Sequence, residues 1–206
     1  MSDLGDTINE VHVEVGNSFD LIRSGQVTVS GEYCILKMNR QVTKPFIQEF
    51  FLEGRFDWDT ETDAGDIVQF NDDRSFMVMN LVPVMFKDET IEKGGVLYKC
   101  NVSGQLMRPS EVEGWDADYR ETGGFDVIAQ DVFALQTEAL YGHELDTDQE
   151  LGALGLENHE LYLPASSGAR VLDRYQPVSG EYYKVDTIKK RRFNKIWVCE
   201  ISEDTR

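Results

Sequence analysis

Two stretches of this chain repeat one spacing of apolar residues, and this internal likeness constrains the fold more than any other feature. In a first block the residues match at a distance of 107 positions: Phe76 with Tyr183, Val78 with Val185, and Leu81 with Ile188. In a second block the distance is 99 positions: Leu97, Tyr98, Cys100, Val102 and Ser103 match Ile196, Trp197, Cys199, Ile201 and Ser202. An ancient duplication predicts two small β-barrels or one sheet with a repeated hairpin. Two amphipathic hairpins that converged on the same spacing would give the same pattern.

Both stretches have the composition of β-hairpins, with β-branched and aromatic residues between runs of turn residues. A further strand is expected over 27–38, with a bend at Gly31. The predicted fold class is therefore mainly β, made of barrel or sandwich hairpins with one or two short helices. The strands expected in the two hairpin regions are 67–70, 75–81 and 96–102, and then 180–188 and 195–201.

The N-terminal segment carries two patterns at once. Val11, Val13 and Val15 alternate with polar residues as in a strand. Ile8, Val11, Val15 and Phe19 also form one stripe of a helix. The sequence leaves both readings open.

The segment between residues 125 and 142 is also ambiguous. A helix is predicted there, although the run FDVIAQDVFAL fits a strand as well. A second short helix is expected near 147–156, with acidic residues in its first turn. The helix in the first segment is predicted by four residues spaced at three and four positions: Ile128, Val132, Leu135 and Ala139.

A chain of 206 residues is long enough for one or two domains. No low-complexity linker divides it, so a single compact domain is one expectation. The alternative division has four parts: an N-terminal region with an aromatic cluster (1–64), a first hairpin unit (65–110), a mixed or helical acidic insert (111–160) and a second hairpin unit (161–206).

The chain is strongly acidic, with 38 Asp and Glu against 20 Lys and Arg and a formal net charge of −18. Binding to nucleic acids rests mainly on cationic contacts to phosphates, so a protein that grips DNA or RNA is disfavoured. An anionic membrane surface is disfavoured for the same reason. No apolar run approaches the roughly 20 residues of a membrane-spanning helix, and the first ten residues lack the pattern of a secretory signal.

The charges are unevenly distributed, with acidic stretches over 57–66 and 144–160 and a basic run over 189–192. Identical acidic chains repel one another, so we expect opposite charges to be placed locally at contacts between subunits. The residues expected at such an interface are Lys189, Lys190, Arg191 and Arg192 on one side, and Asp57, Asp59, Asp146 and Asp148 on the other.

The sequence predicts no catalytic residue, metal ligand or cofactor site. Phosphate-binding loops and serine-nucleophile motifs do not occur, and the three histidines lack the spacing of metal ligands. The segment 146–157 has acidic residues at calcium-loop spacing, but Leu151 stands where the sharp turn needs glycine. The three cysteines are expected to be buried structural thiols.

The stretches GDIVQFNDDRSFMVMNLVPVMF and VLDRYQPVSGEYYKVDTIKKRRFNKIWVCEISEDTR resemble the small β-barrel of head-to-tail connector proteins of tailed bacteriophages, the stopper or head-closure class. The resemblance covers roughly residues 65–110 and 160–206 and lies in the arrangement of strands and turns. It implies that the connection 82–95 is a protruding loop. The residues assigned to that loop are Lys87, Asp88, Glu89, Gly94 and Gly95.

This resemblance implies a structural virion protein that is assembled in the host cytoplasm. Such proteins form a ring between the portal or adaptor and the tail, and they help to close the DNA channel. An acidic channel lining suits this role, because DNA must pass without sticking. The alternatives are another tail-assembly protein, such as a tail terminator or baseplate component, and an acidic cytosolic binding module or enzyme.

Overall fold

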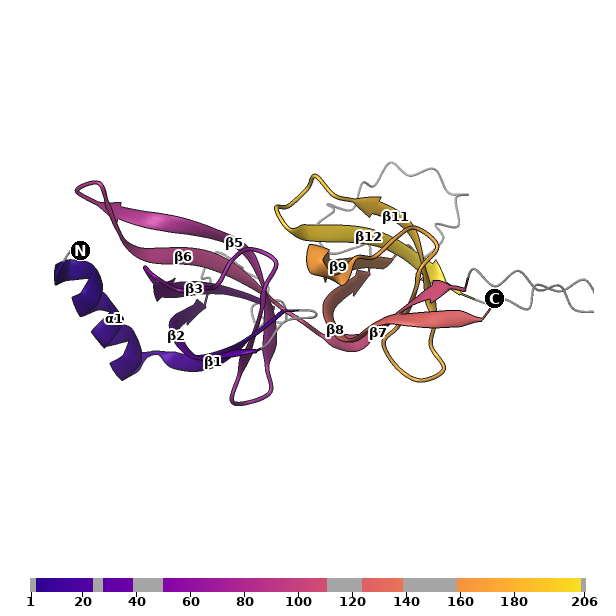
Figure 1. The fold of residues 1–206 in the computed structure, drawn as a ribbon, viewed down its shortest axis with the longest axis horizontal. Coiled ribbons are helices and arrows are strands. Elements are labelled where there is room, and N and C mark those ends of the chain that lie inside the picture. Colours follow the sequence, from indigo (N-terminus) through magenta and orange to yellow (C-terminus); the bar gives the residue numbers. More distant parts are fainter. Residues whose placement is uncertain (1–2, 24–27, 39–49, 111–123, 139–158, 205–206) are drawn as a thin grey trace, which may run out of the picture.

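A computed structural model describes residues 3–23, 28–38, 50–110, 124–138 and 159–204, which form two closed antiparallel β-barrels in tandem (Figure 1). The first barrel contains β1 (Asn17–Ile22), β2 (Val29–Met38), β3 (Phe51–Asp57), β4 (Ile67–Phe70), β5 (Ser75–Phe86) and β6 (Glu89–Lys99). The second contains β7 (Val102–Pro109), β8 (Phe125–Glu138), β9 (His159–Pro164), β10 (Arg174–Gln176), β11 (Tyr183–Lys189) and β12 (Ile196–Glu203). The mainly β fold with two small barrels is thus confirmed.

The two barrels have the same strand order. Around the first barrel it is β1-β2-β3-β6-β5-β4, and around the second it is β7-β8-β9-β12-β11-β10. The barrels meet at residues 100 and 101, inside the expected 65–110 unit, so the first barrel combines strands from two of the four expected parts and the second from three. One helix, α1 (Asp3–Val15), precedes the first barrel, and a short 3₁₀ turn, η1 (Ala165–Ser167), follows β9. The helical alternative for the N-terminal segment is the one observed.

The match at 107 positions reflects a repeated structure. The pairing of β5 shifts register directly after Val78, and that of β11 shifts directly after Val185. Val78 donates its backbone N–H to the carbonyl of Asp66 over 2.9 Å, and Val185 donates to that of Asp173 over 2.8 Å. The two aspartates are again 107 positions apart. Convergence of two unrelated hairpins would not reproduce the bulge and its hydrogen bonds, so a duplication explains the repeat.

The match at 99 positions is wrong. Leu97 pairs with Val78, whereas Ile201 pairs with Val185, so the equivalent residues of β6 and β12 are 104 positions apart. The β5–β6 hairpin is therefore three residues longer than the β11–β12 hairpin. Val102 and Ser103 belong to β7 rather than to the hairpin.

Equivalent bulges also bend β2 and β8. The predicted bend at Gly31 is present, with φ at 88°, and Asp131, 100 positions later, has φ at 52°. Residues 125–138 are thus a strand, and the helix predicted there is wrong. The bulge lets Ala129 and Val132 both face the barrel core, while Leu135 on the opposite face contacts the other barrel, so apolar residues recur at a spacing that imitates a helix. The helix expected near 147–156 lies outside the described residues.

Each barrel contains one arginine–aspartate clamp at an equivalent place. Arg23 donates from Nε and Nη2 to the two carboxylate oxygens of Asp66 over 2.9 and 2.7 Å. Arg108 binds Asp173 in the same way, with both distances 2.9 Å. Each aspartate also accepts the backbone N–H of the residue three positions earlier over 2.8 Å. The clamp fixes the turn before β4 and before β10.

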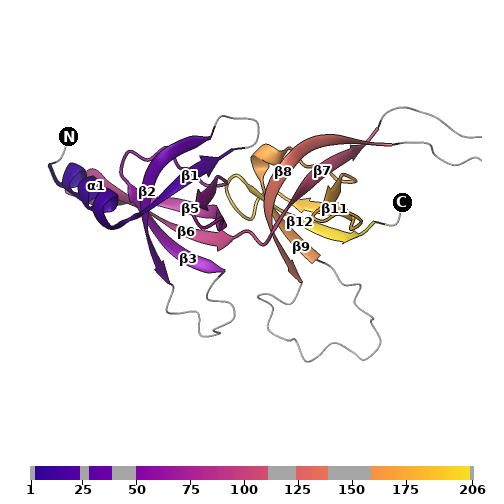
Figure 2. The same cartoon turned by 90° about the horizontal axis from the view of Figure 1, so that it is seen from below.

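A third apolar cluster joins the two barrels. Its buried members in the first barrel are Ile67, Met77 and Met79, and those in the second are Leu135, Tyr162, Ile196 and Val198. The rings of Tyr98 and Tyr162 meet across the junction with centroids 6.2 Å apart. At the far side of the first barrel α1 packs against β2, β3 and β6 (Figure 2). These strands are the equivalents of β8, β9 and β12, which carry the second barrel's half of the junction.

Candidate functional site

An exposed apolar surface of the first barrel is formed by the β5–β6 hairpin, which projects beyond the barrel beside α1 (Figure 1). Within the described chain, β4 pairs with β5 only at residues 75–77, whereas the β5–β6 pairing continues to Phe86 and Glu89. Lys87 and Asp88 form the turn, with φ at 48° and 66°, as a two-residue type I′ hairpin requires.

The expected protruding loop over 82–95 is therefore a protruding hairpin. Lys87 and Asp88 alone form its turn, while Glu89, Gly94 and Gly95 lie in β6. Gly95 pairs with Leu81, and a Cβ there would lie 2.5 Å from the carbonyl oxygen of Asn80. The glycine thus lets the two strands pack closely at the bulge and does not act as a loop hinge.

Four apolar side chains of β5 are exposed, and we call them the hairpin strip. Their exposed fractions are 56% for Val82, 38% for Val84, 54% for Met85 and 48% for Phe86. The whole strand, residues 75–86, contains no charged residue in a chain of net charge −18. Contiguous exposed apolar side chains of this kind mark interaction surfaces. The uncharged run VPVMF (82–86) is the sequence signal for this surface. This signal is missed when the segment is expected to be a loop.

A groove of about 770 Å³ lies beneath the hairpin. Its lining residues are Trp58, Thr60, Glu61, Thr62, Asp63, Leu81, Pro83, Glu89, Thr90 and Lys93. Glu32 organises one wall, because it accepts hydrogen bonds from the hydroxyls of Thr60 and Thr62 and from the backbone N–H of Glu61. Lys93 Nζ donates to the carbonyl of Thr60 over 2.9 Å and so ties β6 to the opposite wall. The hydrogen bond from Lys93 therefore ties the base of the hairpin to the segment that contains Thr60.

Two residues expected at a subunit interface contact α1 within the chain. His12 is 1% exposed, and its Nδ1 shares a hydrogen bond with Asp57. Asn9 Nδ2 donates to Asp59 over 3.0 Å. Burial raises the pKa of the Asp57 carboxyl, and the contact with His12 acts in the opposite direction. Asp57 and Asp59 therefore hold the helix on the barrel.

Replacing His12 with Ala is expected to lower the free energy of unfolding by about 2 kcal/mol near neutral pH, because a buried carboxylate loses its partner. The raised pKa of Asp57 means that protonation favours the folded state, and this gain disappears as pH rises through the folded pKa. Without His12 the pKa rises further, so the deficit should shrink on acidification. Urea unfolding at about pH 7 and about pH 4.5 measures it. Glu10→Ala, on the exposed face of α1, is the control; equal losses at both pH values would contradict the assignment.

The basic run has acidic partners within its own chain. Lys189 Nζ lies 2.7 Å from Glu200 and 3.4 Å from Glu160, and Arg192 lies 3.5 Å from Glu160. The hydrogen bond to Glu200 raises the pKa of Lys189. Lys190 stacks on Trp197, with its Nζ 4.2 Å from the ring centroid.

Electrostatic pairing therefore does not by itself require a neighbouring subunit at this run. An interface role for Lys189, Lys190, Arg191 and Arg192 stays a prediction. Asp146 and Asp148, their expected partners, lie outside the described residues, as does the whole calcium-like segment 146–157.

The three cysteines are free thiols whose surroundings suppress reactivity. Burial raises the pKa of Cys34, Cys100 and Cys199 to about 12. We therefore expect almost no reaction of the folded protein with a disulfide reagent near neutral pH, and release of three equivalents in urea. Rapid labelling of one thiol in the folded protein would show that a cysteine is accessible and activated.

In the described part of the chain no group of three or more His, Cys, Asp or Glu side chains has the arrangement of a metal site. None of the described helices is long and apolar enough to span a bilayer. Comparisons with protein-family models, with curated proteins and with solved structures found no match to this chain.

Proposed function

We propose that this protein is a structural component of the neck of a tailed bacteriophage, where it forms a ring between the portal or adaptor and the tail. The observation that carries an assembly role is the hairpin strip, because four contiguous apolar side chains stand in solvent on an otherwise acidic chain. The resemblance of the two hairpin stretches to connector proteins supplies the particular class. A tail terminator or baseplate component is the alternative with the same physical requirements.

Two further features support a structural role. Both barrels are closed, so apart from the projecting β5–β6 hairpin their described strands leave little sheet edge for uncontrolled pairing with other chains. The net charge of −18 disfavours tight contact with DNA, which a channel component must let pass. These features describe a scaffold that holds a surface in position.

The test is whether the protein assembles and enters virions. Sedimentation velocity and negative-stain images of the purified full chain are expected to show a closed ring. Antibody labelling of phage particles from a host that expresses it is expected to mark the head–tail junction. A protein that stays monomeric at all concentrations and is missing from purified particles would overturn the proposal. Labelling at the distal end of the tail would instead favour the baseplate.

A further inference from the structure

The junction between the two barrels shows how one hairpin of this fold docks on a neighbouring barrel. Phe193, in the turn region between β11 and β12, packs into the shared cluster and meets the ring of Tyr162 at 6.2 Å. Lys195 Nζ binds Asp63 of the first barrel. A Cβ on Gly65 would lie only 2.4 Å from the carbonyl oxygen of Lys195, so the two backbones are in close contact. The β11–β12 hairpin is thus a docking arm of the second barrel.

The hairpin strip occupies the equivalent place on the first barrel. By the 107-position equivalence of β5 and β11, residues 82–86 correspond to 189–193. Both hairpins point in the same direction along the molecule, the β11–β12 hairpin toward the first barrel and the β5–β6 hairpin away from the second (Figure 1). The β5–β6 hairpin is therefore a docking arm that has no receiving barrel among the described residues.

We propose that the hairpin strip docks on the apolar outer face of a β-sheet in a different protein. This inference deepens the proposed function, on which it rests, by naming the kind of neighbour that the arm recognises. The strip places uncharged Val, Pro, Met and Phe where the second barrel has Lys189–Phe193, and Ile91 stands where the second barrel has Lys195, which binds Asp63, so its receiving face is apolar.

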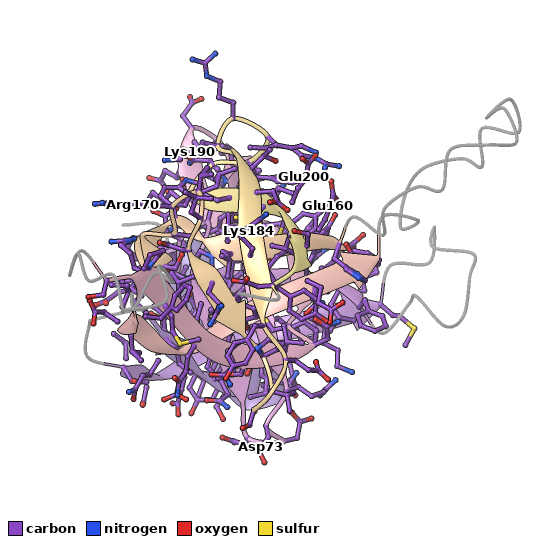
Figure 3. All side chains as sticks on the ribbon, turned by 90° about the vertical axis from the view of Figure 1, so that its right-hand side faces the viewer. Asp73, Glu160, Arg170, Lys184, Lys190 and Glu200 are labelled. Carbon is purple, nitrogen blue, oxygen red and sulfur yellow. The ribbon has the colours of Figure 1, made fainter. Side chains whose placement is uncertain are left out.

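A second copy of the chain does not offer the face that receives the β11–β12 hairpin within this chain. The apolar outer face of its first barrel is already covered by its own second barrel. On the second barrel the equivalent face is polar: Lys184, Asp186, Glu200 and Ser202 stand where the first barrel has Met77, Met79, Val96 and Tyr98. Lys184 and Asp186 pair over 2.9 Å, and Figure 3, which faces this end, shows Lys184 and Glu200 on it.

The contact is made by side chains rather than by strand addition. Beyond residue 77 the outer edge of β5 has no partner strand among the described residues. Pro83 interrupts this edge, because proline has no N–H to offer to a ladder. The strip therefore resembles the knob formed by Phe193 and not a site for an added strand.

The test builds the missing face into the chain itself. The variant Lys184→Met, Asp186→Met, Glu200→Val and Ser202→Tyr places first-barrel residues on the free face of the second barrel. Sedimentation velocity is expected to show that it associates head to tail beyond the parent. Adding Val82→Thr, Val84→Thr and Phe86→Thr, which keeps β propensity, should weaken that association by at least about tenfold.

Each outcome decides the matter. If association persists after the three threonine substitutions, the fourfold variant associates non-specifically. If the fourfold variant does not associate at all, the hairpin does not recognise the apolar face. Either result overturns the proposal. The three threonines in the parent background should leave its self-assembly unchanged, and a loss there would assign the strip to a second copy. If circular dichroism shows that the fourfold variant is unfolded, Glu200→Val with Ser202→Tyr provides the test. No virion is involved, so failure here is distinct from failure of the neck assignment.

Discussion

Replacing Asp173 with Ala is expected to lower the free energy of unfolding by about 3–5 kcal/mol, among the largest effects of a single substitution in this chain. The Asp173 side chain is 1% exposed and accepts both donors of Arg108 as well as the backbone N–H of Arg170. Removing the buried carboxylate leaves the backbone N–H of Arg170 without its acceptor and leaves the guanidinium of Arg108 with only the carbonyl of Gly168. The midpoint and slope of urea unfolding measure the loss.

The duplicated clamp supplies the comparison for this variant. Asp66→Ala removes the same set of bonds from the first barrel and should destabilise it comparably. Asp72→Ala is the matched control, because Asp72 binds Arg74 in an exposed pair, and its loss should leave the unfolding midpoint unchanged. If Asp173→Ala behaved like Asp72→Ala, the clamp would not be what holds the turn before β10.

Replacing Ile196 with Glu is expected to separate the unfolding of the two barrels. Ile196 is fully buried in the cluster that joins them, and the equivalent residue of the first barrel is Glu92. The barrel fold therefore accommodates Glu at this strand position, so the cost falls on the junction. The variant loses the apolar burial of Ile196 and places a carboxylate in the cluster. We expect these two effects to weaken the interaction between the barrels by about 3–5 kcal/mol.

The measurement is urea unfolding followed by far-UV circular dichroism and by tryptophan fluorescence. We expect the variant to unfold in two steps, because each barrel retains its own core but loses the support of the other. Val171→Glu makes the same kind of change at a residue that is 52% exposed, and it should unfold like the parent. A single transition in Ile196→Glu at the parent midpoint would show that the junction contributes little.

Local residue patterns in the sequence predict the β-barrel fold class. They do not predict the features that depend on which strands pair and in which register. The strand spacing around Val78 and Val185 was sufficient to detect the repeat. The alignment of Cys100 with Cys199 was wrong because the two hairpins differ in length, and only the register of the paired strands reveals the difference. The strand at 125–138 was misassigned because a bulge and a second buried face together produce helical periodicity.

The candidate site was only partly predictable for a related reason. The protrusion around Lys87 and Asp88 is an expectation that the resemblance to connector proteins implies. The protrusion is a hairpin because Val82 to Phe86 pair with β6. Apolar residues in a segment expected to be a loop do not by themselves indicate this pairing. Asp57 and Asp59 looked like free surface charges because nothing local in the sequence places His12 and Asn9 against them.

The way in which the barrels are stacked has a consequence for how the chain is prevented from polymerising. The two barrels meet through different faces, so the contact between them is heterologous. A heterologous contact that does not close into a ring can repeat without limit. A duplication that copies both faces leaves one unused at each end, which would make a fibre-forming protein. Here α1 occupies the unused face at one end, and charged residues such as Lys184 and Asp186 replace the apolar ones at the other. The helix and the charges thus oppose the stacking of one copy of the chain on another, while the β5–β6 hairpin still projects beside α1 (Figure 1).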